Sequence, residues 1–285
     1  MLIQLGYDIE LDIPQPLTVV GVLNVHPSRT ADLLEPDHVT VSPSIPVEEY
    51  TDTFGNRCTR FLAPQGTVRL SNSTLIRDSG EPDPVDWSAS QVPVDQLPAD
   101  VLQFLLASRY CEVDSQLGQL AWQLFGNTRA GWPCVQAICD YVNQHVTFGY
   151  QFARPNKTAL DVFNERQGVC RDFQHLAITL CRCMNIPARY ATGYLGDIGV
   201  PPAPCPMDFS AWFEVYLSGR WWTFDARHNR PRIGRVLMAT GRDAADVAIT
   251  TSFGPTALRK FFVVTDEVAE RPAGTAMFAQ ASQTS

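Results

Sequence analysis

The stretch from Gly168 to His175 (GVCRDFQH) constrains the fold of this chain more than any other. After it, apolar residues recur at steps of three and four, the spacing of one buried helix face, and Gly168 breaks the chain just ahead. The pattern therefore predicts a helix that begins near Cys170. The first N–H groups of a helix lack partners within it and its dipole is positive there, so this position favours thiolate over thiol. Cys170 is thus a candidate nucleophile, and an inert buried cysteine is the alternative. The apolar positions of the predicted helix are Phe173, Leu176, Ala177, Leu180, Cys181 and Met184.

The composition is that of a globular protein, because 45% of the 285 residues are hydrophobic and 18% are charged. This length allows two domains with cores of their own. The net charge of -8 and the lack of clustered Lys and Arg argue against nucleic acid as a partner. No apolar run approaches the roughly 20 residues of a membrane span, so we expect no membrane association.

The first residues, MLIQLG, lack the basic region and cleavage site of a signal peptide. We therefore expect a cytoplasmic protein whose eight cysteines are reduced thiols. Their spacing matches no zinc motif, and the acidic segments match no EF-hand loop. No metal and no cofactor are expected.

The chain divides by pattern into a β-rich part and a helical part followed by strands, which predicts an α+β protein. Residues 1–80 hold short β-rich runs separated by Pro, Gly, Asn and Asp turns, which predicts an antiparallel β-sandwich. Residues 81–98 are acidic and Pro-rich and are predicted to be a linker. Residues 99–268 are predicted to form the second domain, and 269–285 a flexible tail. Besides the helix at Cys170, helical periodicity covers about 99–105, 117–125, 133–145 and 156–163.

A predicted hairpin follows the candidate nucleophile. Residues 209–217 alternate between apolar and polar, Ser218 and Gly219 make a tight turn, and 220–225 return. With a two-residue loop, Leu217 pairs with Arg220. Positions 210 and 225 then lie on one face as diagonal neighbours, roughly 7 to 8 Å apart. This face is where the base and the acid of a Cys-His-Asp system belong.

These motifs resemble the bacterial transglutaminase-like superfamily, and the β-rich run around Asp52-Thr53-Phe54-Gly55-Asn56-Arg57 resembles the β-domain that often precedes it. The resemblance covers most of the chain. It implies a papain-like α+β domain in which a cysteine attacks an amide carbonyl of a protein or peptide, and the acyl thioester passes to an amine or to water. By this resemblance Cys170 is the nucleophile and Asp225 the acid. The matching segments are GVCRDFQHL (168–176), GYL (193–195), AWFEVYL (211–217), WTFD (222–225) and GRDAADV (241–247).

The histidine of the family pattern does not carry over, because His-Ala-Trp is replaced by Ser210-Ala211-Trp212. A serine hydroxyl has no basic form near neutral pH. His228 is the candidate base in its place, since it follows Asp225 by three residues. A strand that continues past Asp225 would put His228 on the opposite face, whereas a strand that ends there would let a loop bring the ring back.

Other side chains near these motifs have mainly structural interpretations. His175 lies about 140° round the helix from Cys170, so it should point elsewhere. Asp208 shares the face of Ser210 and is either a poor substitute base or a solvated carboxylate. The backbone N–H of Cys170 is a candidate oxyanion donor.

Three functions stay open at this point. The first is a cysteine-dependent amide acyltransferase or hydrolase with a relocated base. The second is a catalytically impaired binding or scaffold protein in which Ser210 fills vacated space. The third is binding by the N-terminal β-domain, with the second domain only supporting it.

Overall fold

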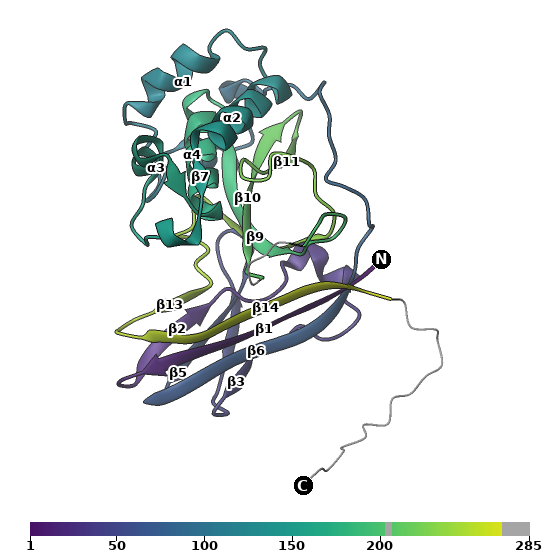
Figure 1. Cartoon of the computed structure of the whole chain (residues 1–285), viewed down its shortest axis with the longest axis vertical. Coiled ribbons are helices and arrows are strands. Elements are labelled where there is room, and N and C mark those ends of the chain that lie inside the picture. Colours follow the sequence, from purple (N-terminus) through teal and green to yellow (C-terminus); the bar gives the residue numbers. More distant parts are fainter. Residues whose placement is uncertain (203–206, 270–285) are drawn as a thin grey trace.

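The computed structural model describes residues 1–202 and 207–269, which form two lobes (Figure 1). The lower lobe is a β-sandwich of two four-stranded sheets. Its strands are β1 (Leu2–Ile13), β2 (Leu17–Gly21), β3 (Thr40–Ser42), β4 (Glu48–Thr51), β5 (Arg57–Ala63), β6 (Gly66–Arg77), β13 (Thr250–Ser252) and β14 (Ala257–Val268). One sheet has the order β14-β1-β6-β3 and the other β13-β2-β5-β4, and every pairing is antiparallel.

The end of the described chain returns to this sandwich. β14 pairs along nearly the whole of β1, from Leu2 with Val268 to Asp12 with Ala257, and β13 pairs with β2. The prediction placed residues 99–268 in the second domain, whereas these two strands complete the two sheets of the first. The sequence of a strand shows which side chains face the core, but it does not show which distant strand it pairs with. The pairing of the two ends of the chain therefore could not be predicted. Of the predicted tail 269–285, only residue 269 lies within the described residues.

The predicted linker, residues 81–98, contains a turn at 87–88 and a 3-10 turn, η2 (Val94–Gln96), and it packs on the upper lobe. The N–H of Ser218 donates to the carbonyl of Ser90, and the N–H of Trp132 donates to the carbonyl of Ala89. The segment is therefore attached to the second lobe along its length.

The upper lobe packs helices against one face of a four-stranded antiparallel sheet (Figure 1). α4 is the central helix: residues 172–182 are all buried, and it contacts the other three helices and the sheet. Its apolar face meets the prediction, and α1 and α2 match the predicted helices. The helix predicted at 156–163 begins at 159, and the one predicted at 99–105 is a short 3-10 helix, η3 (Leu102–Leu105). The elements are α1 (Leu117–Phe125), α2 (Trp132–His145), α3 (Ala159–Glu165), α4 (Cys170–Cys183), β9 (Ala188–Leu195), β10 (Ser210–Leu217), β11 (Arg220–Phe224) and β12 (Arg235–Gly241), with a parallel pair β7 (Thr147–Phe148) and β8 (Gln167–Gly168).

The hairpin of β10 and β11 has the predicted register. Leu217 pairs with Arg220, and the pairing ends at Phe213 with Phe224. Ser218 and Gly219 have φ angles of 50° and 82°. Positive φ at both turn residues is the requirement of a type I′ hairpin turn, so the tight turn sets the register that brings the end of β11 toward α4. The fold is α+β, as predicted.

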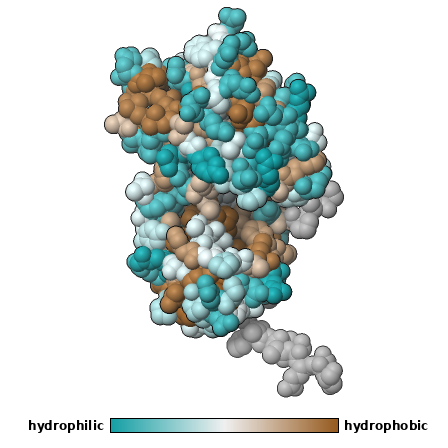
Figure 2. All heavy atoms as spheres, turned by 90° about the vertical axis from the view of Figure 1, so that its left-hand side faces the viewer, coloured by the Kyte–Doolittle hydropathy of each residue, from teal (hydrophilic) through white to brown (hydrophobic). Residues whose placement is uncertain are grey.

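Figure 2 shows that hydrophilic residues cover most of one side of the molecule and that apolar residues form separate patches. Exposed apolar side chains in the upper lobe include Trp122 and Leu124 of α1. Within residues 1–202 and 207–269, none of the helices combines the length and the apolar character needed to cross a bilayer.

Candidate active site

The turn before α4 presents Cys170 as the first residue of the helix. The N–H of Val169 donates to Oδ2 of Asp172 at 3.0 Å, so this carboxylate folds back over the turn. A Cβ on Gly168 would lie 2.7 Å from the Cβ of Asp172, closer than carbon atoms pack. Glycine at 168 is therefore what allows the carboxylate to cap the helix and hold the nucleophile in place.

Cys170 lines a cavity of about 250 Å³ together with Ser210 and His228. Three of the four predicted site residues thus meet at one cavity, called here the thiol pocket. The fourth, Asp225, is 5% exposed and lies behind His228. The thiol pocket is also lined by Tyr150, Leu195, Asp197, Met207, Asp208, Phe209, Arg227 and Arg232.

The chain turns sharply after β11 ends at Phe224, and the turn folds around the carboxylate of Asp225. The backbone N–H groups of Arg227 and His228 donate to Oδ1 at 3.0 and 3.1 Å. Nδ1 of His228 lies 2.8 Å from Oδ2. Of the two predicted alternatives, the structure has the one in which the strand ends and the loop returns the ring.

Two further side chains hold Asp225. Gln174 donates from Nε2 to Oδ1 at 3.1 Å, and Arg235 donates from Nη2 to Oδ2 at 2.9 Å. Burial alone would raise the pKa of Asp225, but the charge of Arg235 and the hydrogen bonds from His228 lower it well below its usual range. Asp225 is therefore a carboxylate at any pH at which the protein would work.

Neither Gln174 nor Arg235 was predicted from the sequence as a partner of Asp225. Gln174 lies four residues after Cys170, one helical turn, so it projects from the same face of α4, and that spacing was a usable signal. Arg235 comes from β12, and no pattern in the sequence relates that strand to the turn at Asp225.

The ionised Asp225 fixes the protonation of the neutral His228 ring. A carboxylate only accepts hydrogen bonds, so Nδ1 of His228 must carry a proton. In the neutral ring Nε2 is then the basic nitrogen. His228 thus has the tautomer that a general base needs.

The protonation of Cys170 differs from the expectation. Burial raises its pKa to about 11, and the negative charges of Asp208 and Asp225 act in the same direction. The charge of Arg227 and the N–H of Arg171 oppose this shift without overcoming it. This direction is opposite to the expected preference for thiolate, because loss of water around the sulfur disfavours the anion.

The remaining predicted residues have clear positions. His175 is fully buried, accepts from the N–H of Ala244 at Nε2 and stacks on Tyr110 at 5.0 Å, so its structural role is confirmed. Asp208 is half-buried and lines the thiol pocket, and loss of water raises its pKa. Within the described ranges, no group of three or more His, Cys, Asp and Glu side chains is arranged to hold a metal ion.

Comparison with known proteins gives a consistent result. The family model of the transglutaminase-like superfamily matches residues 119–226. The crystal structure of a candidate cysteine protease from Cytophaga hutchinsonii is 32% identical and superposes with a TM-score of 0.81, covering 95% of this chain and 93% of that one. An uncharacterized protein from Mycobacterium leprae is 25% identical over 231 residues, which are 78% of this chain and 81% of that protein. On its fold, its motifs and these similarities, the chain belongs to the transglutaminase-like superfamily.

Proposed function

We propose that this protein catalyses cysteine-dependent amide acyl transfer or hydrolysis on a protein or peptide, through a thioester on Cys170. One observation carries the proposal. His228 lines the same pocket as the thiol, and its Nδ1 lies 2.8 Å from the buried carboxylate of Asp225. A nucleophile, a base and an orienting acid are the three parts that this chemistry requires.

The first step is attack of the thiol on the amide. Because burial keeps Cys170 protonated near neutral pH, the sulfur needs a base at the moment of attack. Nε2 of His228 takes the proton as Sγ forms a bond to the carbonyl carbon. Asp225 stabilises the imidazolium that results.

Collapse of the tetrahedral intermediate gives the thioester. The N–H of Cys170, at the first position of α4, has no acceptor within the helix and stabilises the oxyanion. The C–N bond breaks as His228 returns its proton to the leaving amine. In the second half, water or an amine attacks the thioester, His228 takes the proton of the attacking group, and the C–S bond breaks as that proton returns to sulfur.

Ser210 fits this arrangement. Its side chain lines the thiol pocket at the position where the family pattern has histidine. A histidine there would compete with His228 for one carboxylate, whereas a serine is small enough to leave that carboxylate to His228. A serine at 210 is therefore consistent with a base that lies 18 positions later in the chain, at His228.

Trapping of the thioester tests the proposal. The protein is incubated with a mixture of tryptic peptides and hydroxylamine, which converts an acyl thioester into a hydroxamate. We expect peptide hydroxamates from the wild type and none from Cys170→Ala. Cys183→Ala is the matched control, because Cys183 is also half-buried but lies at the far end of α4.

The raised pKa of Cys170 and the serine at 210 also favour a second candidate, a binding or scaffold protein with an impaired site. The trapping experiment separates the two. Absence of hydroxamate from the wild type, from peptides that still bind the protein, would support the scaffold and reject the enzyme.

A further inference from the structure

One cation of the thiol pocket lacks an ion-pair partner among the described residues. Arg232 is 4% exposed, donates from Nη2 to the carbonyl of Gly196 at 2.9 Å and lies 3.8 Å from Asp197. The half-buried Arg227 differs, because its guanidinium makes no ion pair and no hydrogen bond with any residue that the structure describes. The charged side chains that line the thiol pocket, beside the imidazole of His228, are Asp197, Asp208, Arg227 and Arg232.

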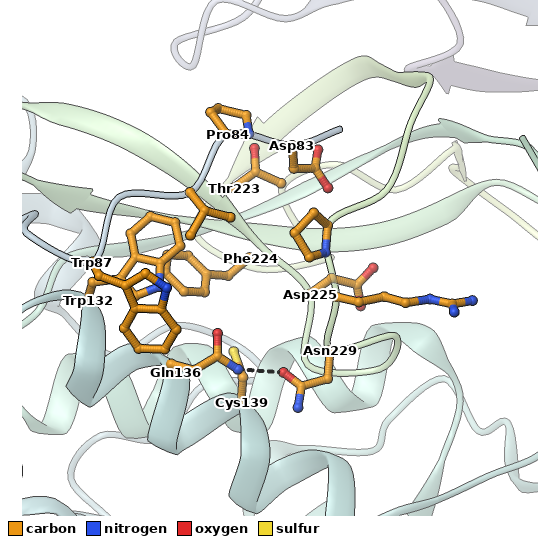
Figure 3. Close-up of a pocket in the computed structure, with 13 residues that line it drawn as sticks. Asp83, Pro84, Trp87, Trp132, Gln136, Cys139, Thr223, Phe224, Asp225 and Asn229 are labelled. Atoms are coloured by element: carbon orange, nitrogen blue, oxygen red, sulfur yellow. Dashed lines mark hydrogen bonds between the residues drawn. The ribbon is translucent and has the colours of Figure 1, made fainter. Parts of the chain in front are cut away.

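The main chain of Arg227 is fixed in place. Its N–H donates to Oδ1 of Asp225 at 3.0 Å, and its carbonyl accepts from Nδ2 of Asn143, on α2, at 2.7 Å. Asn229 closes the same turn, because its N–H donates to the carbonyl of Asp225 and its Oδ1 accepts from Gln136 at 2.9 Å (Figure 3). The turn therefore presents the side chain of Arg227 from a fixed backbone.

An aromatic ring orients the side chain of Arg227. Its guanidinium carbon lies over the ring of Phe148, on β7, 3.8 Å from the ring centroid. This is a close cation–π contact, and a guanidinium above a ring keeps its in-plane N–H groups available for hydrogen bonds. The planar group matches the two oxygens of a carboxylate, to which it donates two parallel hydrogen bonds.

The charge of Arg227 reaches the reactive sulfur. Burial raises the pKa of Cys170, and the strongest influence in the opposite direction is the positive charge of Arg227. The ring of Phe148, which carries the guanidinium, lies 6.5 Å from the ring of Phe173, three residues after Cys170 on α4. A substrate that enters the thiol pocket therefore meets the guanidinium and the sulfur in one cavity.

Asp208 opposes an anionic ligand only in part. Loss of water raises its pKa, while the N–H of Phe209 and the charge of Arg227 lower it. Within the described ranges no ion pair joins Asp208 to Arg227, so this carboxylate does not occupy the N–H groups of the guanidinium. A second carboxylate nearby would raise the pKa of Asp208 further, and a protonated Asp208 would donate a hydrogen bond to it.

We infer that Arg227 binds a carboxylate of the acyl donor, so that preferred substrates carry a negative charge close to the amide that Cys170 attacks. The inference rests on the proposed function for the amide, whereas the carboxylate site itself depends only on the pocket. The carboxylate belongs either to an acidic side chain or to the C-terminus of a peptide. Arg227 donates to its oxygens in the same way in both cases.

Two alkylating reagents of nearly the same shape test the carboxylate site without amide turnover. Iodoacetate carries a carboxylate and iodoacetamide a neutral amide, and each forms a C–S bond with the thiolate as iodide leaves. Both reagents react with the same thiolate, so a change in the pKa of Cys170 cancels in the ratio of their rates. The reduced full-length protein is treated with each reagent, and modification of Cys170 is followed by mass spectrometry.

Arg227→Gln should lower the ratio of the iodoacetate rate to the iodoacetamide rate about 10-fold, the lower end of the range for a hydrogen bond to a charged group. Arg227→Lys should lose less, because it keeps the charge without the planar group. Asp208→Asn should raise the ratio, because it removes the opposing carboxylate. Arg220→Gln is the matched control, since Arg220 is exposed and also lies over an aromatic ring, 4.1 Å from the centroid of Trp222.

The inference is overturned if Arg227→Gln keeps the wild-type ratio, or if Arg220→Gln lowers the ratio as much. It is supported if the ratio falls in Arg227→Gln alone and rises in Asp208→Asn. Because the reagents need only the thiol, these outcomes do not depend on the proposed function.

The hydroxamates of the trapping experiment identify the source of the carboxylate. A bound acidic side chain should place Asp or Glu beside the trapped carbonyl, whereas a bound C-terminus should give products that lack only the last residue of the parent peptide. Hydroxamates with neither feature would contradict the inference. A fall of the ratio in Arg227→Gln, in a protein that yields no hydroxamate, would reject the proposed function and keep the carboxylate site.

Discussion

His228 and Asp225 are three residues apart in one turn, and Nδ1 of His228 lies 2.8 Å from Oδ2 of Asp225. The same carboxylate accepts the backbone N–H groups of Arg227 and His228. The carboxylate therefore holds both the main chain of the turn and the imidazole that projects from it. The acid and the base of the candidate site are positioned relative to each other by local structure.

Replacement of His228 by alanine should strongly slow amide chemistry at Cys170. A positioned general base contributes about 100- to 10,000-fold, so we expect a loss in this range in the rate of hydroxamate formation. The measurement is the initial rate at neutral pH with hydroxylamine as acceptor. His38→Ala is the matched control, because the side chain of His38 is 69% exposed on the sandwich, and an equal loss in both variants would contradict the role of His228.

A histidine at position 210 should rescue the protein that lacks His228. Position 210 lines the thiol pocket, and without His228 the carboxylate of Asp225 is free to orient another imidazole. We expect His228→Ala with Ser210→His to regain at least about 10-fold in rate over His228→Ala alone, a fraction of the general-base effect. Ser210→Ala in the same background controls for loss of the hydroxyl. No gain from the histidine, in a protein that folds normally, would mean that position 210 cannot serve the thiol.

Removal of Arg235 should destabilise the fold in a pH-dependent way. Its side chain is 7% exposed and bonds both Asp225 and Asp83. Breaking a buried ion pair costs about 3 to 5 kcal/mol, and we expect Arg235→Met to lose an amount in this range at pH 7. The measurement is the free energy of unfolding by urea.

The sign of the pH effect follows from Asp225. Its folded pKa is lowered, so its contribution to stability is present above the unfolded pKa and is lost only as pH falls through the folded pKa. Without Arg235 the carboxyl is protonated more easily, so the destabilisation should be smaller at pH 4 than at pH 7. Arg259→Met, which breaks an exposed ion pair with Asp12, should change stability little at either pH.

The sequence predicted those parts of the fold that depend on interactions between residues close together in the chain. The apolar period of α4 and the Ser218-Gly219 turn fixed the nucleophile helix and the hairpin register, because each depends on residues a few positions apart. The closing strand β14 and the Arg235 contact to Asp225 depend on partners that only the tertiary fold brings together. The direction of the Cys170 pKa shift also lies beyond local patterns, because the loss of water around its sulfur depends on the whole lobe.

The buried and half-buried thiols should make the protein sensitive to alkaline pH. Burial raises the pKa of every cysteine in residues 1–202 and 207–269, to about 11 for Cys170. In the unfolded chain a thiol has a pKa of about 8.5. The folded state therefore keeps protons that the unfolded state releases, so the stability from each thiol is fully present below about pH 8.5 and is lost as pH rises toward 11.

Cys170 supplies the cleanest test of this linkage. Between pH 9 and pH 10.5 the stability of the wild type should fall more steeply than that of Cys170→Ala, by up to about 1.4 kcal/mol per pH unit for the one thiol removed. The measurement is urea unfolding at several pH values with a reductant present, so that no disulfide forms. His38→Ala keeps all the thiols and should follow the wild-type slope. Equal slopes for wild type and Cys170→Ala would mean that the thiol ionises as readily in the folded protein as in the unfolded chain, which would contradict the raised pKa of Cys170.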